Sequence, residues 1–434
     1  MISLGKNIKK VFKNAGILAS GDIIAAIFGL ISFGILGRSL GVNSLGAFSV
    51  IITYVTLIEK FFNFQSWQAL IKYGNKFNCK KEILNFNLLN SFGLLVDIFS
   101  AIIAFLLSIT LCNYLVDFFN WSSEEIKLIK IYSIVILFNI EGVPTAIFRI
   151  QNKFLYFSKK AVIISSIKLI LFFIGWSYSF EIDYYIYSTL IAQIIGYIFF
   201  LSKSLNYSDL NLIQILSNSN IKKVLRKNPK FLSFLFQSNI QSSLKLSTSL
   251  FDTLLVSKYL GDSAAGLLQV AKQFSKIFTQ ISSPLYKSIY PELASLWQLN
   301  NIKEFKLLIL NSIKITMIAS SFMYLLFVFF GKFIIMTYIG LDFINSYYLM
   351  VFYFLGNVIQ SSSFPLSPAF LAMGYPRIPL ITTFISSLFF IIIFILTYKK
   401  YDYLTIGISY ALMTSLWLFL NIFMYKHKMK KYYD

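Results

Sequence analysis

Cysteine and histidine are scarce in this 434-residue chain, and their scarcity excludes several chemistries. Cys79 lies in a lysine-rich loop and Cys112 at the far end of the next apolar run, so we expect no disulfide between them. The single histidine, His427, is in the C-terminal tail, which excludes histidine-based metal centres and histidine proton relays inside a membrane. A glycine-rich phosphate loop followed by Lys-Ser or Lys-Thr is also absent, which argues against ATP hydrolysis by this chain.

Charged residues are scarce too, at 13% of the chain, whereas soluble domains carry about 25%. Hydrophobic residues reach 57% and the mean hydropathy is +0.70, yet 39 lysines and arginines against 18 acids give a net charge of +21. A nucleic-acid binder would carry its basic residues on a soluble, charged surface, so this combination argues against one. It predicts a multi-pass membrane protein whose lysines lie in loops on one side of the bilayer.

The apolar runs predict an all-α integral membrane protein with twelve transmembrane helices of roughly 20 residues each. The predicted spans are 14–36, 46–70, 86–111, 126–150, 160–180, 184–202, 231–256, 264–290, 307–330, 345–372, 378–398 and 404–425. Most lysines and arginines fall in the loops on the side of the N-terminus, while the opposite loops are richer in acids. Both termini are therefore predicted to be cytoplasmic.

The spans predict two six-helix lobes, residues 1–203 and 231–425, which are joined by a basic cytoplasmic linker at 204–230 and followed by a basic cytoplasmic tail at 426–434. The linker holds apolar residues at helical spacing and a basic cluster that ends at Pro229. We interpret it as an interfacial helix, and a plain positive topology signal explains the same residues.

The two halves of the chain resemble each other. Gly41 and Gly46 match Gly261 and Gly266 at an offset of 220 residues, and a polar stripe on the second helix of each half repeats at the same offset. The stripe consists of Ser49, Thr53, Thr56, Lys60 and Asn63, matched by Gln269, Gln273, Lys276, Gln280 and Ser283. A lipid-facing helix would not keep such a stripe, so both helices are predicted to line one aqueous cavity. The lobes are predicted to be related by a pseudo-two-fold axis along the membrane normal.

Three short motifs carry a family resemblance: Gly-Arg-Ser-Leu-Gly at 37–41, Gly-Ala-Phe at 46–48 and Trp-Gln-Ala-Leu-Ile-Lys-Tyr at 67–73. With the central basic loop, they resemble the polysaccharide (O-antigen type) flippases of the multidrug/oligosaccharidyl-lipid/polysaccharide (MOP) exporter superfamily. The resemblance implies a transporter, not an enzyme, with no bound cofactor. Its implied substrate is undecaprenyl-diphosphate-linked oligosaccharide of the O-antigen, lipopolysaccharide or capsule type, which moves to the outer leaflet of the bacterial inner membrane by alternating access. The implied partners are membrane lipids, a glycan polymerase and a chain-length regulator.

Ionisable residues inside the predicted spans are costly, at about 2.5–3.5 kcal/mol each near the bilayer centre, so most of them should face a polar cavity. The second lobe holds four lysines and too few acids to neutralise them. We predict that they bind the pyrophosphate and acidic sugars of the substrate. The predicted substrate-binding residues are Lys245, Lys272, Lys276 and Lys314, with Lys60, Gln273 and Gln280.

The first lobe is instead rich in acids. Asp22 and Glu141, followed by Glu59 and Asp97, are predicted to couple transport to an H⁺ or Na⁺ gradient. The alternative is that these acids form salt bridges with Lys60, Lys168 or the second-lobe lysines. Three basic residues are predicted at the cytoplasmic mouth, namely Arg149, Lys153 and Arg377. No metal site is predicted.

Two other functions remain open. A multidrug or cation exporter of the same superfamily would need acids lining its binding lobe, whereas the second lobe here is cationic. A membrane glycan polymerase or ligase would need a sizeable outer loop with catalytic groups, whereas the predicted outer loops are short and contain no histidine.

Overall fold

The computed structural model describes residues 2–64, 66–79, 82–210 and 218–430. Within these ranges the side chains of residues 2–19, 76, 78–79, 218–219, 221, 240–249, 277, 279–288, 291 and 430 are not described. The described residues form helices joined by short connections, and no strand occurs among them. The predicted all-α class is therefore confirmed.

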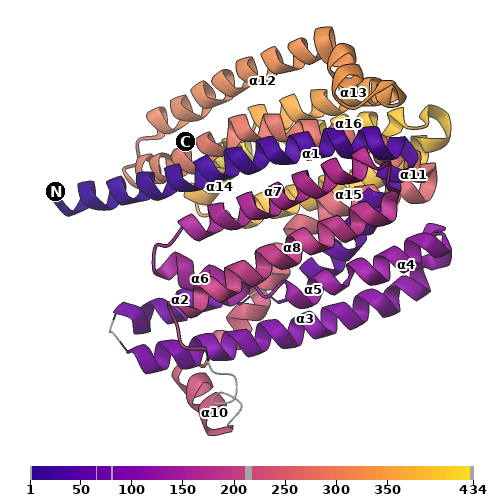
Figure 1. The fold of residues 1–434 in the computed structure, drawn as a ribbon. Coiled ribbons are helices and arrows are strands. Elements are labelled where there is room, and N and C mark those ends of the chain that lie inside the picture. Colours follow the sequence, from indigo (N-terminus) through magenta and orange to yellow (C-terminus); the bar gives the residue numbers. More distant parts are fainter. Residues whose placement is uncertain (1, 65, 80–81, 211–217, 431–434) are drawn as a thin grey trace. The chain divides into compact units, whose positions relative to one another are not determined.

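The chain divides into two compact units, Met1–Leu40 with Val50–Leu254 and Gly41–Ser49 with Leu255–Asp434. Two long helices, α1 (Ile2–Phe62) and α11 (Phe231–Gln298), contribute to both units (Figure 1). The first unit also contains α2 (Trp67–Cys79), α3 (Ile83–Phe119), α4 (Ser123–Tyr132), α5 (Ile134–Phe138), α6 (Gly142–Ile150), α7 (Leu155–Ser177), α8 (Ile182–Leu205) and α10 (Asn218–Lys227). The second contains α12 (Ile302–Tyr338), the 3₁₀ turn η1 (Leu341–Phe343), α13 (Ile344–Ser362), α14 (Leu366–Ala372), α15 (Arg377–Tyr401) and α16 (Leu404–Lys430). These divisions differ from the predicted lobe limits at 203 and 231, which stay predictions.

Long apolar helices make this a multi-pass membrane protein. Among the described residues, eight helical stretches are long and apolar enough to cross a bilayer. In α3, for example, large apolar side chains such as Phe99 and Leu106 are exposed on the surface of the protein, as expected for contact with lipid. The count of twelve spans, the two-lobe symmetry and the side of the termini stay predictions.

Each unit has an apolar core at the meeting point of its helices. In the first, Phe77, Leu89 and Val143 pack with Val224 of α10 and Phe231 at the start of α11. In the second, α11, α12, α14 and α16 meet around buried residues that include Leu293, Phe305, Phe370 and Met429. The core of the first unit fixes α10 against the ends of α2 and α3.

At each of the connections predicted near residues 37–45 and 257–263, two helices meet at a kink of one glycine, and α1 and α11 each comprise both helices. Gly41 interrupts α1 with φ 70° and ψ −179°, and Gly261 interrupts α11 with φ 80° and ψ 174°. Residues with a Cβ rarely adopt such backbone angles, whereas glycine does so at little cost. The two glycines that the sequence repeat matches therefore have the same conformation.

The helical segments that follow these two kinks pack against each other inside the second unit. A Cβ placed on Gly46 would lie 1.7 Å from the carbonyl oxygen of Asp262, and one placed on Gly266 would lie 2.2 Å from the carbonyl oxygen of Val42. The hydroxyl of Ser263 donates to Oδ1 of Asn43 at 3.2 Å. Gly46 and Gly266 are equivalent residues 220 positions apart, and so are Val42 and Asp262. The two close contacts are therefore equivalent to each other, as in a two-fold symmetric crossing.

Replacing either crossing glycine should destabilise the protein. For Gly46→Ala and Gly266→Ala we expect a melting temperature in detergent at least several degrees lower, because a backbone carbonyl occupies the space that the new methyl group needs. Gly29→Ala is the matched control, because a Cβ there meets nothing within 4 Å. Alanine in a helix is favoured over glycine by about 0.5–1 kcal/mol, so this control should melt at or above the wild-type temperature. Unchanged melting of Gly46→Ala would contradict the crossing.

Candidate functional site

The candidate site is built where two predicted spans are broken side by side. The span predicted at 46–70 ends as a helix at Phe62 and resumes at Trp67, and the span predicted at 126–150 consists of the three short helices α4, α5 and α6. Neither span is one continuous helix, so both predictions are wrong in this respect. Pro144 lacks the backbone N–H that a helix continuing through residues 139–141 would need. The side-chain amide of Asn63 donates to the carbonyl oxygen of Asn139 at 3.1 Å and joins the two breaks.

A buried carboxylate from α3 clamps both breaks. Asp97 is 1% exposed. Its Oδ1 accepts the backbone N–H of Ser66, before α2, at 2.9 Å, and its Oδ2 accepts the N–H of Val143, at the start of α6, at 3.0 Å. A negative charge is favoured at helix N-termini, where N–H groups lack helical partners. Asp97 therefore caps two helices at once.

Gly142 allows this close approach. A Cβ at position 142 would lie 2.4 Å from Oδ2 of Asp97 and 2.6 Å from the backbone nitrogen of Ser66. Any larger residue would separate α6 from the carboxylate, so the sequence Glu141-Gly142 places an acid and the permissive residue together at the break.

Glu59, near the end of α1, lies beside this clamp and is 6% exposed. It accepts the ammonium of Lys60 at 2.8 Å and the side-chain amide of Asn139 at 2.5 Å. The hydroxyl of Ser100, on α3, donates to Oδ1 of Asn63 at 3.2 Å and extends the network towards Asp97. The polar side chains of α1, α3 and the α5–α6 break therefore form one hydrogen-bonded cluster.

A second lysine–glutamate pair completes the cluster. Lys160 of α7 donates to Oε1 of Glu141, and the two side chains are 18% and 19% exposed. The ammonium of Lys160 also lies 4.8 Å from the ring centre of Phe200 on α8. The partners predicted for the first-lobe acids were Lys60, Lys168 or the second-lobe lysines, so the structure corrects the partner of Glu141 to Lys160.

Each of the two lysine–glutamate pairs in the first unit is electrically neutral. The Asp97 carboxylate has no lysine in these pairs and is stabilised by two backbone N–H groups. A proton arriving on a glutamate, or an anion arriving at a lysine, would break a pair and release its partner. The cluster is therefore able to respond to protonation or to an anionic ligand.

The remaining predicted residues are placed as follows. Asp22 is exposed on α1, and Arg377 is exposed at the first position of α15. Arg149 lies 4.3 Å from the ring centre of Trp67, and Lys153 lies 5.2 Å from that of Tyr207. Both are exposed near the α6–α7 connection.

In the second unit, Lys276 is exposed and donates to Oε1 of Gln273 at 2.6 Å. Lys272 is half-buried on α11, and Lys314 is exposed on α12. The side chains of Lys245 and Gln280 lie outside the described residues. The four-lysine binding cluster thus stays a prediction.

Sequence reasoning missed Lys160, Asn139 and the capping role of Asp97. Lys160 is the first residue of the span predicted at 160–180, and its position gives no sign that it faces Glu141. Asn139 lies two residues before Glu141, and both polar residues precede Pro144 within the predicted span. Polar residues just before a proline are the signal in the sequence that the helix is interrupted there.

The family model described as polysaccharide biosynthesis protein matches residues 11–297, about two thirds of the chain. The chain belongs to this family. The family resemblance drawn from the sequence motifs is thereby confirmed.

Polysaccharide biosynthesis family membership agrees with the relatives found. Inner membrane protein YghQ of Escherichia coli (strain K12) is 22% identical over 295 residues, which cover 66% of this chain and 81% of that protein. The structure of the lipid II flippase MurJ in an inward closed conformation matches this chain with a TM-score of 0.72 and 18% sequence identity. The match covers 94% of this chain and 87% of the MurJ chain. An inward-facing multidrug resistance MATE family transporter of the MOP superfamily has a TM-score of 0.75 at 12% identity and covers 94% and 95%. The chain has the fold of these transporters.

Asp97→Asn should destabilise this family member, because the amide NH₂ that replaces one oxygen would face a backbone N–H donor. We expect a loss of about 1–3 kcal/mol in the free energy of unfolding. The measurement is thermal or denaturant unfolding in detergent. Asp117→Asn is the matched control, because it makes the same change at an exposed position of the same helix. Equal stability of the two variants would show that the clamp does not hold the breaks together.

A double-mutant cycle tests the Glu141–Lys160 pair. Glu141→Gln and Lys160→Met should each destabilise the protein, since each leaves a partly buried charge without its partner. The double variant should recover part of the loss, with a coupling energy of about 0.5–3 kcal/mol. Lys159→Met, at an exposed neighbouring position, should change little. Additive losses in the unfolding measurements would mean that the two side chains do not interact.

Proposed function

We propose that this protein is a flippase that moves undecaprenyl-diphosphate-linked oligosaccharide, a repeat unit of O-antigen or capsule type, across the bacterial cytoplasmic membrane by alternating access. The family match over residues 11–297 carries the proposal. The fold shared with the lipid II flippase supports it, because that protein's name states a lipid-linked class of cargo.

The excess of basic over acidic residues favours an anionic cargo over a cationic one. In the first unit Glu59 and Glu141 each hold a lysine, so a cation would have to displace an ammonium and a diphosphate would have to displace a carboxylate. Lysine ammonium groups are suitable partners for a diphosphate. In this proposal the diphosphate is bound by lysines and neighbouring amides and is received at the cytoplasmic mouth by three further basic residues. The proposed binding residues are Lys245, Lys272, Lys276, Lys314, Lys60, Gln273 and Gln280, and those of the mouth are Arg149, Lys153 and Arg377.

We further propose that transport is coupled to an H⁺ or Na⁺ gradient through the acids of the first unit. Glu141 is the favoured residue among Asp22, Glu59, Asp97 and Glu141, because it is partly exposed and its proton or ion would displace Lys160. Asp97 is least favoured, since backbone N–H groups occupy both of its oxygens. The gradient needs no bound cofactor.

A multidrug exporter is the second candidate function, because a MATE family transporter shares the fold at a TM-score of 0.75. A glycan polymerase or ligase finds less support, since the connections between α3 and α4 and between α15 and α16 are only a few residues long. A glycan polymerase and a chain-length regulator are proposed instead as partners of the transporter.

Deletion of the gene tests the proposed function directly. We expect the lipid-linked oligosaccharide to accumulate on the cytoplasmic face, measured by its protection from an added glycosidase in intact spheroplasts and its cleavage in inverted vesicles. The wild-type chain should restore export, and Lys276→Gln should restore it several-fold less well. Export should also fall when the coupling gradient is dissipated. Unchanged glycan distribution combined with new sensitivity to cationic drugs would overturn the flippase in favour of the exporter.

A further inference from the structure

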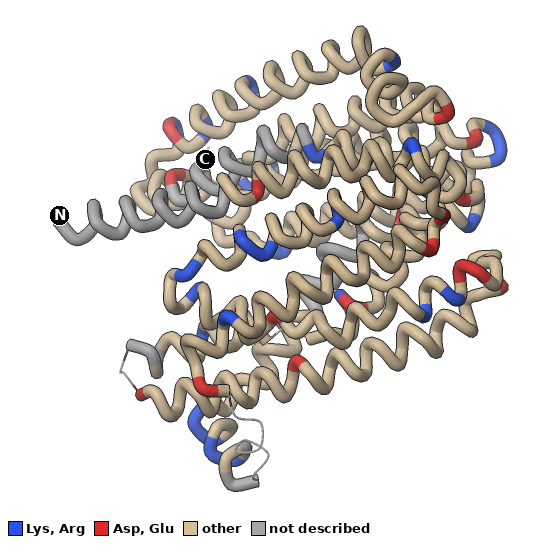
Figure 2. Tube along the Cα trace, viewed as in Figure 1, with Lys and Arg blue, Asp and Glu red and all other residues tan. Residues whose placement is uncertain are grey.

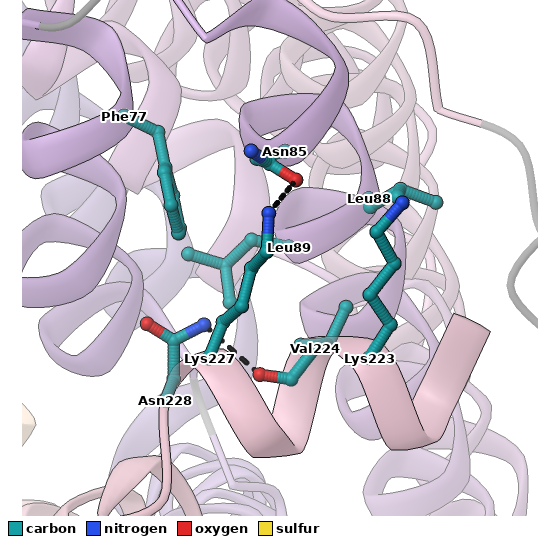
Figure 3. A pocket seen from close by; sticks show the side chains of 8 residues that line it. All are labelled: Phe77, Asn85, Leu88, Leu89, Lys223, Val224, Lys227 and Asn228. Carbon is teal, nitrogen blue, oxygen red and sulfur yellow. Dashed lines mark hydrogen bonds between the residues drawn. The ribbon is translucent and has the colours of Figure 1, made fainter. Parts of the chain in front are cut away.

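A shallow pocket lies at one end of the first unit, between α10 and the ends of α2 and α3 (Figure 3). It encloses about 10 Å³, and the rest of it is open to solvent. Its lining consists of Phe77, Asn85, Leu88, Leu89, Lys223, Val224, Lys227 and Asn228. The four apolar members are all buried and form its floor, while the lysines and asparagines supply its polar groups. The pocket is therefore amphiphilic, with cations above an apolar surface.

The amphipathic helix α10 places the two lysines. Val224 is buried in the apolar core with Leu89 and Phe231, and the side-chain amide of Asn228 donates to the carbonyl oxygen of Val224 at 3.0 Å. Lys223 and Lys227 are four residues apart and thus share one face of the helix. In Figure 3 both side chains rise from α10 towards the first turns of α3, on either side of an open space.

Hydrogen bonds hold one ammonium in place at the rim. Lys227 donates to Oδ1 of Asn85 at 2.8 Å, and Nδ2 of Asn85 donates to Glu82 at 2.6 Å. Two lysines one helical turn apart repel each other, and an anion between them removes that repulsion. The pocket is therefore suited to a small, doubly coordinated anionic group.

The surroundings place this pocket at the level of lipid headgroups. Ile83 and Leu84 at the start of α3, and Leu232 and Phe236 at the start of α11, are large exposed apolar residues next to it. Figure 2 shows basic residues gathered on α10 and around the α6–α7 connection, while acids are prominent at the α3–α4 turn. By the positive-inside rule, the end with α10 faces the cytoplasm, where anionic lipids attract basic segments.

We propose that this pocket binds a phosphate group, that of an anionic phospholipid of the cytoplasmic leaflet. The phosphate oxygens lie between the ammonium groups of Lys223 and Lys227, and the acyl chains contact the exposed apolar side chains of Ile83 and Leu84. Free inorganic phosphate offers the same chemistry without the apolar part, so these exposed side chains favour the lipid. The site does not depend on the proposed flippase activity.

The test uses the full chain in detergent, with bound phosphatidylglycerol measured by native mass spectrometry and by the shift in melting temperature. Lys223→Gln/Lys227→Gln removes the two pocket cations. Lys222→Gln/Arg226→Gln removes the same charge from exposed positions of the same helix that do not line the pocket. We expect the first variant to lose at least about tenfold more affinity than the second, or ~1.4 kcal/mol. Lys223→Arg/Lys227→Arg should keep binding, which separates loss of the site from misfolding.

Further arms identify the source of the phosphate. Phosphatidylcholine should bind at least several-fold more weakly than phosphatidylglycerol, and millimolar inorganic phosphate should leave the bound lipid in place. Displacement of the lipid by inorganic phosphate would show that the pocket binds the free ion, and it would overturn the proposal that it binds a phospholipid. If the two double glutamine variants lose equal affinity for phosphatidylglycerol, the attraction comes from the overall surface charge of α10, and the proposal of a specific site in the pocket is overturned.

Discussion

The contact between the Asp97 carboxylate and two backbone N–H groups determines how the first unit is arranged. Because Ser66 and Val143 share one carboxylate, the break between α1 and α2 must lie next to the break between α5 and α6. That proximity brings Glu59 to Asn139 and leaves Glu141 facing α7, where Lys160 meets it. Moving either helix start by a few ångströms would take one of its two backbone donors from a buried carboxylate, which is costly in a protein interior. The polar cluster thus has a defined geometry although it is built from interrupted helices.

Lysines, rather than free cations, balance the buried glutamates. The ammonium group of a lysine is part of the protein, so it stays beside its glutamate and does not exchange with ions in solution. Each lysine–glutamate pair therefore stays neutral when no ligand is bound. The same tethering makes each pair a competitor for incoming ligands, because an anion must draw the lysine away from its glutamate.

The helices and the two kinks were accessible from sequence, whereas the pairing of charges was not. Hydropathy located the long apolar segments, and the 220-residue offset identified Gly41 and Gly261 as equivalent before their shared backbone angles were known. Hydropathy averages over about twenty residues, so it cannot register an interruption as short as the one between the end of α1 at Phe62 and the start of α2 at Trp67. The capping role of Asp97 depends on segments 31 and 46 residues away along the chain, and the position of Lys160 depends on how α7 packs. Such contacts leave no periodic pattern in a single sequence.

The reciprocal contact of Gly46 and Gly266 has an evolutionary consequence. A residue that touches its own equivalent 220 positions later reproduces, within one polypeptide, the isologous interface of a two-fold dimer. In a two-fold dimer of identical chains a single mutation alters both sides of such a contact at once, whereas here each side is encoded separately. Asn43 and Ser263 occupy equivalent positions, are different residues and hydrogen-bond to each other. Substitutions at these positions are therefore expected to be inherited in pairs, which makes the crossing a place where relatives of this chain should record correlated change.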